Sequence, residues 1–510
     1  MTKKIVYLPL DERPCNYAFA SFLSENNPDY VLVRPPLDIL GRKKKEANHE
    51  KIVEFLQTEC KDAYGLVLSV DMLLYGGIVP SRLHDFRLPE LEKRLALLKE
   101  LKRVNPKLKI YAFALIMRCP CYSSSDEEPD YYETYGRRIF LHGQAVHKYE
   151  EGIISKEEFE AFQAENTDEF NACLQDFLKR RKRNLFALFD LLGYVGQTVD
   201  KLVIPQDDSA PYGYTAIDQK KVREFILKNQ IQEIDIYPGA DEVGMTLLSA
   251  MVVNMKKKAP RICPVYPKPE CAEIIPLYED RAVKRSIKSQ IINAGGVFTE
   301  NEEKADILLF CNLPVGQMKD YTAQQGASGD DLPQYAAREL DKFTAKMANA
   351  LANGRQVAAA DLAYCNGGDL EWVTLISETI GLFRLSGYAG WNTSSNSLGT
   401  VICQAVLFYY YGNTSTHKTF LAERIFEDVG YCAYARKYIC DNILPSMGFG
   451  YFQVDGRRGK VSEIVKKTLE EYTAEKFPAV AERFEITDCE MPWSRMFEVG
   501  LTVKEKEPSL

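Results

Sequence analysis

Short apolar runs alternate with longer amphipathic stretches along the first half of the chain. The apolar runs are rich in Val, Ile and Leu and lie at 4–10, 30–36, 65–74, 109–117, 201–208 and 233–242. Between most of them, stretches such as 49–60 and 89–104 carry apolar residues three and four positions apart, which is typical of helices. Buried strands that alternate with amphipathic helices predict an α/β fold with a parallel sheet.

The alternation is interrupted once and then resumes. A charge-rich section at 126–197 predicts a helical insertion after the fourth strand. Further apolar runs follow at 262–267, 296–300, 305–314, 356–367 and 382–391, and the total is too large for a single eight-stranded barrel. We therefore predict a TIM-barrel-like or doubly wound domain at 1–258, a second, smaller α/β domain at 259–412 and a mainly helical region at 413–510.

Polar and ionisable side chains follow almost every predicted strand. Parallel strands bring their carboxyl ends to one face, where ligands bind, so we expect these side chains to converge. For any single carboxylate, a helix-capping role is an equally good explanation. The candidates for catalysis are Asp207, Asp208, Asp241 and Glu242, and the candidates for substrate binding are Asp11, Arg13, Asp71, Arg82, Arg118, Tyr212, Asp361, Asn366, Trp391, Asn392 and Asn396.

Glycines accompany two of these positions. Gly239 and Gly244 flank the pair Asp241 and Glu242, so the backbone can turn sharply and we expect the two carboxylates to face outward. The pair at 76–77 predicts a tight loop that presents Arg82. Neither pattern is a dinucleotide fingerprint or a phosphate loop.

The stretch YAGWNTSSNSLGT at 388–400 supports two interpretations. It lies between apolar segments, so Asn392, Thr393 or Ser394 could simply cap a helix that begins near Asn396. Alternatively, it forms part of a substrate pocket, with an exposed face of Trp391 as a stacking platform and the asparagine amides as hydroxyl contacts. A cap needs only one polar residue and no Trp, which favours the pocket.

The candidate set is suited to cleavage of glycosidic bonds. That reaction needs one protonated carboxyl group for the leaving oxygen and a second group that handles the developing cation. A neighbouring like charge raises the pKa of one carboxyl group and keeps it neutral near pH 7. Successive residues of an extended chain point in opposite directions, however, so the adjacent pairs alone do not establish the chemistry.

Two other classes of function use the same residues. Asp11, Asp71, Asp207, Asp208 and Asp361 could hold Mg²⁺ or Mn²⁺ in a metal-dependent hydrolase or phosphoryl-transfer enzyme. A non-catalytic protein could bind a small ligand without turnover.

The arginine candidates bear on the charge of the substrate. Arg13, Arg82 and Arg118 either neutralise the acids of the site or bind an anionic sugar such as a uronic acid, a sialic acid or a sugar phosphate. The first arrangement predicts a neutral substrate and the second an anionic one.

Composition narrows the partners. The chain has 510 residues, 46 % of them hydrophobic and 27 % charged, and its net charge of −8 with scattered lysines argues against nucleic acid. The five histidines show no metal-ligand spacing, so neither a metal nor a cofactor is predicted. The longest apolar segment, 398–411, is too short for a membrane span. We expect a cytoplasmic protein with a small carbohydrate as its partner, and self-assembly is left open.

Two short motifs resemble those of known glycosidases. YPGADEVG at 237–244 is similar to the Gly-Gly-Asp-Glu motif of retaining β-N-acetylhexosaminidases, which implies Glu242 as the general acid and Asp241 as the residue that orients the acetamido group. QDDSAPYG at 206–213 is similar to the Asp-Asp pair of O-GlcNAcase-type enzymes, which implies Asp207 and Asp208 in these roles.

The whole chain resembles a bacterial family called domain of unknown function 4127. The motifs that carry this resemblance are PLDERP, SVDMLLYGG, QDDSAPYG, PGADEVG, DLAYCNGGD and YAGWNTSSNSLGT. They are spread over nearly the full length. The resemblance implies kinship and a bacterial, cytosolic origin, but no particular activity.

Overall fold

The computed structural model describes residues 2–324 and 333–507, and its chain folds into two compact units. Unit 1 comprises Met1–Glu12, Asn27–Gly244 and Tyr278–Asp280. Unit 2 comprises Arg13–Asn26, Met245–Leu277 and Arg281–Leu510. The region 413–510 thus belongs to the same unit as most of 259–412, while the three-part division of the chain stays a prediction.

Unit 1 is built on a six-stranded parallel sheet with the order β2-β1-β3-β4-β5-β6. Its strands are β1 (Lys3–Leu8), β2 (Tyr30–Val33), β3 (Gly65–Ser69), β4 (Lys109–Phe113), β5 (Lys201–Gln206) and β6 (Ile234–Pro238). Each strand lies within or at an apolar run of the sequence. The central strand β3 is buried along its whole length, as expected for a strand covered on both faces.

The strand order identifies a doubly wound sheet. The chain runs from β1 outward to β2, returns past β1 to β3 and then continues in sequence to β6. With the right-handed crossovers usual between parallel strands, this order places helices on both faces. Because β2 and β6 form the two edges, the described strands leave the sheet open, and no TIM barrel is formed.

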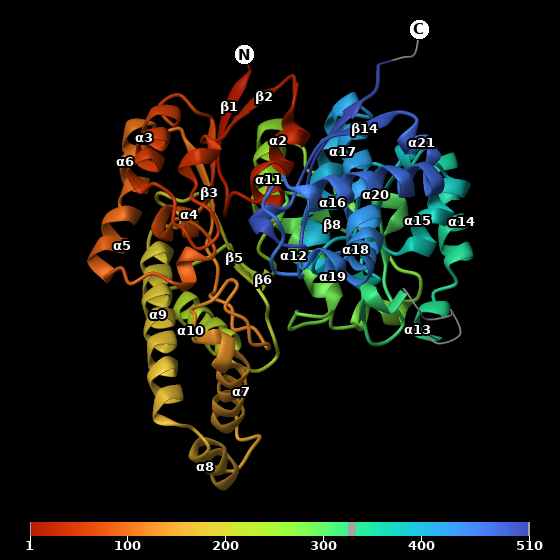
Figure 1. The fold of residues 1–510 in the computed structure, drawn as a ribbon. Helices are drawn as coiled ribbons and strands as arrows, with labels where there is room; N and C mark the ends of the chain where they lie inside the picture. Colours follow the sequence, from red (N-terminus) through yellow and green to blue (C-terminus); the bar gives the residue numbers. More distant parts are fainter. Residues whose placement is uncertain (1, 325–332, 508–510) are drawn as a thin grey trace. The chain divides into compact units, whose positions relative to one another are not determined.

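The helices of unit 1 include a long arm. They are α3 (His49–Glu59), α4 (Val70–Tyr75), α5 (Leu88–Leu95), α6 (Leu97–Val104), α7 (Tyr132–Glu150), α8 (Lys156–Ala164), α9 (Asp168–Leu192) and α10 (Tyr214–Lys228). Figure 1 shows α7, α8 and α9 extending away from the sheet, with α8 at the tip. This arm is the predicted helical insertion. The side chain of Thr167 begins α9 by accepting a hydrogen bond from the Phe170 N–H.

Unit 2 contains a second parallel sheet with the order β13-β11-β9-β7-β8. Its strands are β7 (Arg261–Val265), β8 (Val297–Phe298), β9 (Ile307–Asn312), β11 (Gln356–Asp361) and β13 (Tyr388–Ala389). The order matches that of the first five strands of unit 1. A short parallel pair, β10 (Lys319–Asp320) with β12 (Tyr364–Cys365), is formed by segments that come between strands of this sheet along the chain. The predicted second α/β region is therefore confirmed.

Helices make up most of the rest of unit 2. They are α1 (Pro14–Tyr17), α2 (Phe19–Ser24), α12 (Val283–Asn293), α13 (Pro333–Ala336), α14 (Leu340–Ala352), α15 (Leu370–Thr379), α16 (Ser394–Tyr411), α17 (Ser415–Arg424), the π-helical segment η8 (Ile425–Ala435), α18 (Arg436–Asn442), α19 (Leu444–Met447), α20 (Lys460–Lys476) and α21 (Pro478–Ala481), and α11 (Val243–Lys256) begins in unit 1. None of the described helices combines the length and apolar character needed to cross a membrane.

The C-terminal region is mostly helical, as predicted, but it also contains a hairpin. β14 (Phe484–Glu490) and β15 (Gly500–Glu505) pair in the antiparallel direction. The apolar pattern of the sequence did not predict these strands. Their side chains alternate between buried and exposed positions in FEIT at 484–487, which is the pattern of a half-covered strand.

Candidate functional site

Three neighbouring strands of unit 1 bring several candidates together. Asp71 follows β3, Arg118 follows β4, and Asp207 and Asp208 follow β5. Because these strands are adjacent and parallel, their carboxyl ends lie at one edge of the sheet. Ligands of open α/β sheets bind outside this edge.

Two arginines and four acidic side chains form an ion-pair network, here called the carboxylate–guanidinium cluster. Its members are Arg82, Arg118, Glu127, Glu128, Asp207 and Asp208. Arg82 donates to Asp207 at 2.7 Å and to Glu127 at 3.0 Å. Arg118 donates to Asp208 at 3.0 Å and to Glu128 at 2.7 Å. Both guanidinium groups are thus engaged by protein carboxyl groups.

The cluster has a buried end and an open end. Arg82 and Glu128 are almost completely buried. By contrast, 21 % of the Asp207 side chain and 20 % of the Asp208 side chain are exposed. The arginines hold the deep side of the cluster, and the two aspartates are its members most accessible to a ligand.

The backbone at Asp208 explains how two successive side chains reach the same cluster. Its φ of 39° lies in the left-handed region, which Asp adopts more readily than most residues. In an extended chain Asp207 and Asp208 would point to opposite sides. The turn at Asp208 removes this alternation, so both carboxyl groups contact arginines of the cluster.

The surroundings of Asp208 hold its proton at neutral pH. Burial and the negative charge of Asp207 raise the pKa of Asp208 to about 7, although Arg118 and Arg82 act in the opposite direction. A carboxyl group with this pKa donates a proton near pH 7, beside a second carboxyl group paired with Arg82. This is the combination expected of a general acid and its partner.

Three contributors to the site were missed by the sequence analysis: Tyr122, Glu127 and Glu128. Tyr122 is 42 % exposed. Arg118 acts to lower the pKa of its hydroxyl, but burial and Asp208 act against it, and the pKa lies above its ordinary value. All three residues belong to the irregular segment 114–131 between β4 and α7, where the acidic run DEE was the available signal.

Lys43, within the basic run GRKKKE at 41–46, approaches the same segment. Lys43 forms an ion pair with Asp126 and its backbone N–H donates to Glu12 at 2.9 Å. This run therefore contacts the acidic segment of the site.

Asp71 is buried beside the cluster. Its Oδ2 accepts a hydrogen bond from the Leu115 N–H at 2.9 Å. Burial raises the pKa of Asp71 to about 7, while the Leu115 N–H and the charge of Arg82 act to lower it. Asp71 is thus a second carboxyl group whose proton is held near neutral pH.

Replacing Asp71 by Asn is expected to stabilise the protein at pH 8. A native pKa raised from 3.8 to about 7 means that Asp71 favours folding below pH 4 and loses this contribution as the pH rises toward 7, by up to about 4 kcal/mol. The Asn side chain of the variant has no charge to bury and can still accept a hydrogen bond from the Leu115 N–H. Urea unfolding at pH 5 and pH 8 should show the advantage of the variant growing with pH.

Asp200 provides a matched control because it precedes β5, at the opposite end of that strand. Burial acts to raise the pKa of Asp200, but hydrogen bonds from Lys102 and from the Ile110 N–H outweigh burial, so the pKa lies below its ordinary value. Asp200→Asn should therefore lose stability, with the loss present above pH 4. Equal pH dependence in the two variants would contradict the account of Asp71.

Three further candidates of unit 1 are buried within the fold. Glu242 is fully buried, and its Oε2 accepts a hydrogen bond from the Ala240 N–H at 3.0 Å. A Cβ at Gly239 would lie only 2.1 Å from the Glu242 carboxyl group. The expectation that Asp241 and Glu242 face outward is therefore wrong, because both side chains are buried. Asp11 is also buried.

The ring contacts of Tyr212 are with residues outside the carboxylate–guanidinium cluster. Its ring packs edge-on against His147 of α7, with centroids 5.4 Å apart. Arg13 belongs to unit 2, where its guanidinium lies 4.7 Å from the centroid of the Trp493 ring.

In unit 2, Asp361 lies at the carboxyl end of β11 in a buried network. It accepts hydrogen bonds from Tyr388 at 2.9 Å and from Asn312 at 3.1 Å. Arg338 contacts Asn312 and Asp369 in the same network. Burial and the charge of Asp369 raise the pKa of Asp361 to about 7. The network links the ends of β9, β11 and β13.

Trp391 does not present an exposed face, so that expectation is wrong. Only 7 % of the residue is exposed, and its ring packs edge-on against Phe19 with centroids 5.8 Å apart. Its indole N–H donates to Thr400 at 3.2 Å, and its backbone N–H donates to the Ser397 hydroxyl at 2.9 Å. The stretch at 388–400 is a packed junction between β13 and α16.

The asparagines near this junction also have structural contacts. Asn366 donates to Asp320 at 2.9 Å, and its backbone N–H donates to the Asn392 carbonyl at 2.7 Å. Asn366 and Asn392 both have positive φ, at 65° and 50°. Asn396 is buried in the first turn of α16. Thr393 begins this helix without a side-chain capping bond, so the expected cap is not formed by its hydroxyl.

A second set of charged residues in unit 2 was not predicted, here called the Arg424 cluster. Arg424 is fully buried and pairs with Glu423 at 3.1 Å, Glu427 at 2.5 Å and Asp428 at 2.9 Å. Asp428 also accepts a hydrogen bond from the Gly390 N–H at 2.8 Å. The sequence signal was the spacing of Glu423, Glu427 and Asp428 around one arginine, which follows a helical turn.

The described residues contain no group of three or more His, Cys, Asp or Glu side chains arranged to hold a metal ion.

The fold and the site define an α/β protein with two doubly wound parallel sheets and a carboxyl-rich cluster at the strand ends of the first. The family model described as "Protein of unknown function (DUF4127)" matches residues 5–502, so the chain belongs to this family. This confirms the resemblance inferred from the sequence motifs. A search of the curated proteins finds no match.

Proposed function

We propose that unit 1 carries the active site of a glycoside hydrolase or a related carbohydrate-active enzyme. The observation that carries the proposal is the pair Asp207 and Asp208, two neighbouring, partly exposed carboxyl groups in one cluster. Asp208 holds a proton near pH 7 and would donate it to the leaving oxygen. Asp207, held by Arg82, would stabilise the developing cation or activate water.

The charge of the cluster favours a neutral sugar. Four carboxyl groups surround two guanidinium groups, and both Arg82 and Arg118 already pair with at least three of them. Neither arginine is left to bind an anionic group of a substrate. Tyr122, which is 42 % exposed, would contact a sugar face, the role first expected of Trp391.

The proposal is tested with a panel of nitrophenyl glycosides that covers neutral, N-acetylated and uronic acid sugars. We expect release of nitrophenol from one or more neutral sugars, with and without EDTA. Asp207→Asn should lose most of this activity, whereas Asp200→Asn, which removes an equally exposed carboxylate at the other end of β5, should retain it.

Two results would overturn the proposal. Activity that EDTA abolishes and Mg²⁺ or Mn²⁺ restores would favour the metal-dependent alternative. Saturable binding of a sugar without any turnover would favour a binding protein.

A further inference from the structure

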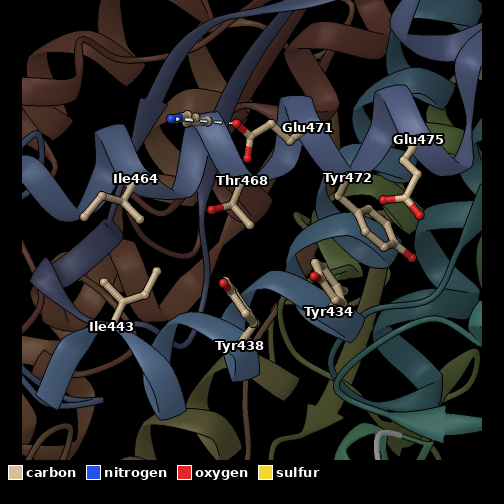
Figure 2. A pocket seen from close by; sticks show the side chains of 9 residues that line it. Tyr434, Tyr438, Ile443, Ile464, Thr468, Glu471, Tyr472 and Glu475 are labelled. Atoms are coloured by element: carbon tan, nitrogen blue, oxygen red, sulfur yellow. Dashed lines mark ion pairs between the residues drawn. The ribbon is translucent and has the colours of Figure 1, made fainter.

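A groove in unit 2 lies between η8 and α18 on one side and α20 on the other, as Figure 2 shows. Its cavity volume is about 420 Å³, which is within the range of small-molecule sites. We call it the tyrosine groove, and its lining residues are Tyr434, Tyr438, Ile443, Ile464, Lys467, Thr468, Glu471, Tyr472 and Glu475. None of them belongs to the carboxylate–guanidinium cluster.

Three stacked tyrosine rings line the tyrosine groove, two from η8 and α18 on one side and one from α20 on the other. Tyr434 stacks on Tyr472 with centroids 4.3 Å apart and on Tyr438 with centroids 5.9 Å apart. The two interplanar angles are 16° and 8°, so the rings form a nearly parallel series. Tyr472 also packs edge-on against Phe477. This packing fixes the positions of the three tyrosine rings before any ligand binds.

Tyr438 is the ring of this series that is open to a ligand. It is 42 % exposed, and Figure 2 shows it between Tyr434 and Ile443, with Thr468 across the groove. The face of an aromatic ring carries negative potential and attracts a cation. Ile443 and Ile464 at the other end of the groove offer an apolar surface.

The charges of the lining favour the same kind of ligand. Glu471 and Glu475 are one helical turn apart on α20, so they lie on one face of that helix. Glu471 pairs with Lys467 at 3.7 Å and Glu475 pairs with Lys476 at 2.9 Å, and all four side chains are exposed. Exposed pairs of this kind are weak, so a ligand can compete with the lysines. The lining itself carries two carboxylates and one lysine, so its own net charge is negative; Lys476, which pairs with Glu475, lies outside the lining.

We propose that the tyrosine groove binds a small organic cation with an apolar body, such as an alkylammonium or arylammonium ion. The apolar body lies against the isoleucines. The ammonium group lies over the face of Tyr438 and exchanges its contact with water for contact with Glu471 or Glu475.

The test compares choline with its neutral isostere 3,3-dimethylbutan-1-ol on the full chain, using ligand-observed NMR or calorimetry. The two probes have nearly the same shape and differ in charge. Choline should bind in the millimolar range and about threefold or more tighter than the alcohol, because an exposed cation–π contact contributes roughly 0.5–1 kcal/mol. Equal affinity, or no binding of either probe, would refute the proposal.

Variants at two positions distinguish the contribution of the Tyr438 ring to choline binding from that of the charged residues. Tyr438→Leu should abolish the preference for choline, and Tyr438→Phe should keep it, since both keep bulk but only Phe keeps the ring face. Lys467→Met should tighten choline binding, because it removes the cation that competes for Glu471. Choline binding that is the same in Tyr438→Leu as in the native protein would show that this groove is not the site.

Discussion

Replacing Arg424 by Met is expected to lower the free energy of unfolding of unit 2 by about 3–5 kcal/mol at pH 8. Arg424 is fully buried and pairs with Glu423, Glu427 and Asp428. Its guanidinium also lies 3.8 Å from the centroid of the Phe19 ring. Met fills a similar volume but leaves three buried carboxyl groups without their cation, and that loss dominates over any gain in apolar contact.

The effect of Arg424→Met should depend on pH. Burial raises the pKa of Glu423 to about 7, of Glu427 to about 8 and of Asp428 to about 6, while Arg424 acts to lower all three. Without Arg424 these values rise further. Each carboxyl group contributes its full stability below its unfolded-state pKa of about 4 and loses that contribution as the pH rises through its native pKa, so the additional loss in the variant develops as the pH passes the pKa values of the native protein. We therefore expect a smaller loss of stability at pH 5 than at pH 8.

Arg458 offers a matched control for this measurement. It contacts Asp488 at 3.2 and 2.7 Å and Glu490 at 2.6 Å, but its side chain is more than half exposed and Glu490 is also held by Arg457. Arg458→Met should change the stability by about 1 kcal/mol or less. Adding Glu427→Gln to Arg424→Met should recover part of the lost stability. If urea unfolding shows equal losses for the two arginine variants, the three buried acids do not depend on Arg424.

The sheets of both units could be predicted because their strands are buried. Continuous apolar runs such as 65–74 and 305–314 correspond to β3 and β9, whose residues are buried throughout. The hairpin of β14 and β15 was missed although Phe484 and Ile486 alternate with exposed residues. A two-residue period over so few positions is easily taken for a helix end in a charged region.

The strand order could not be predicted from the apolar runs. Both a barrel and an open sheet bury such strands on two faces, and the difference lies in which strands pair. In unit 1 the chain returns past β1 to β3, and this pairing gives an open sheet and not a barrel. That return depends on contacts between distant segments, which the local pattern does not contain.

The meeting of candidate side chains could be predicted where they follow parallel strands, but not where loops supply them. Asp207, Asp208, Arg82 and Arg118 meet as expected. Their partner Glu127 comes from an irregular segment, whose path no periodicity describes.

Trp391 is a further residue whose surroundings the local sequence could not predict. The sequence placed it in a polar stretch, which indicated exposure. Its burial results from packing against Phe19, which is distant in the chain. The composition of a short stretch does not reveal such a contact.

Under the proposed function, replacing Asp208 by Asn is expected to lower kcat on the best neutral glycoside by about 10²–10⁴-fold, the usual contribution of a general acid. Asn keeps the size of the side chain and can still accept a hydrogen bond from Arg118, but it has no proton to give. Because burial and Asp207 raise the pKa of Asp208 to about 7, the native rate should fall as the pH rises above 7. The variant should lack this alkaline limb.

Asp207→Asn distinguishes the roles of the two aspartates in the same pH profiles. Removing the negative charge of Asp207 takes away one of the influences that raise the pKa of Asp208. Any residual activity of Asp207→Asn should therefore begin to fall at a lower pH than that of the native protein, because Asp208 loses its proton sooner. Asp200→Asn should leave the profile unchanged. An alkaline limb that persists in Asp208→Asn would assign the acid to another residue, with Asp71 the next candidate since its pKa is also raised to about 7.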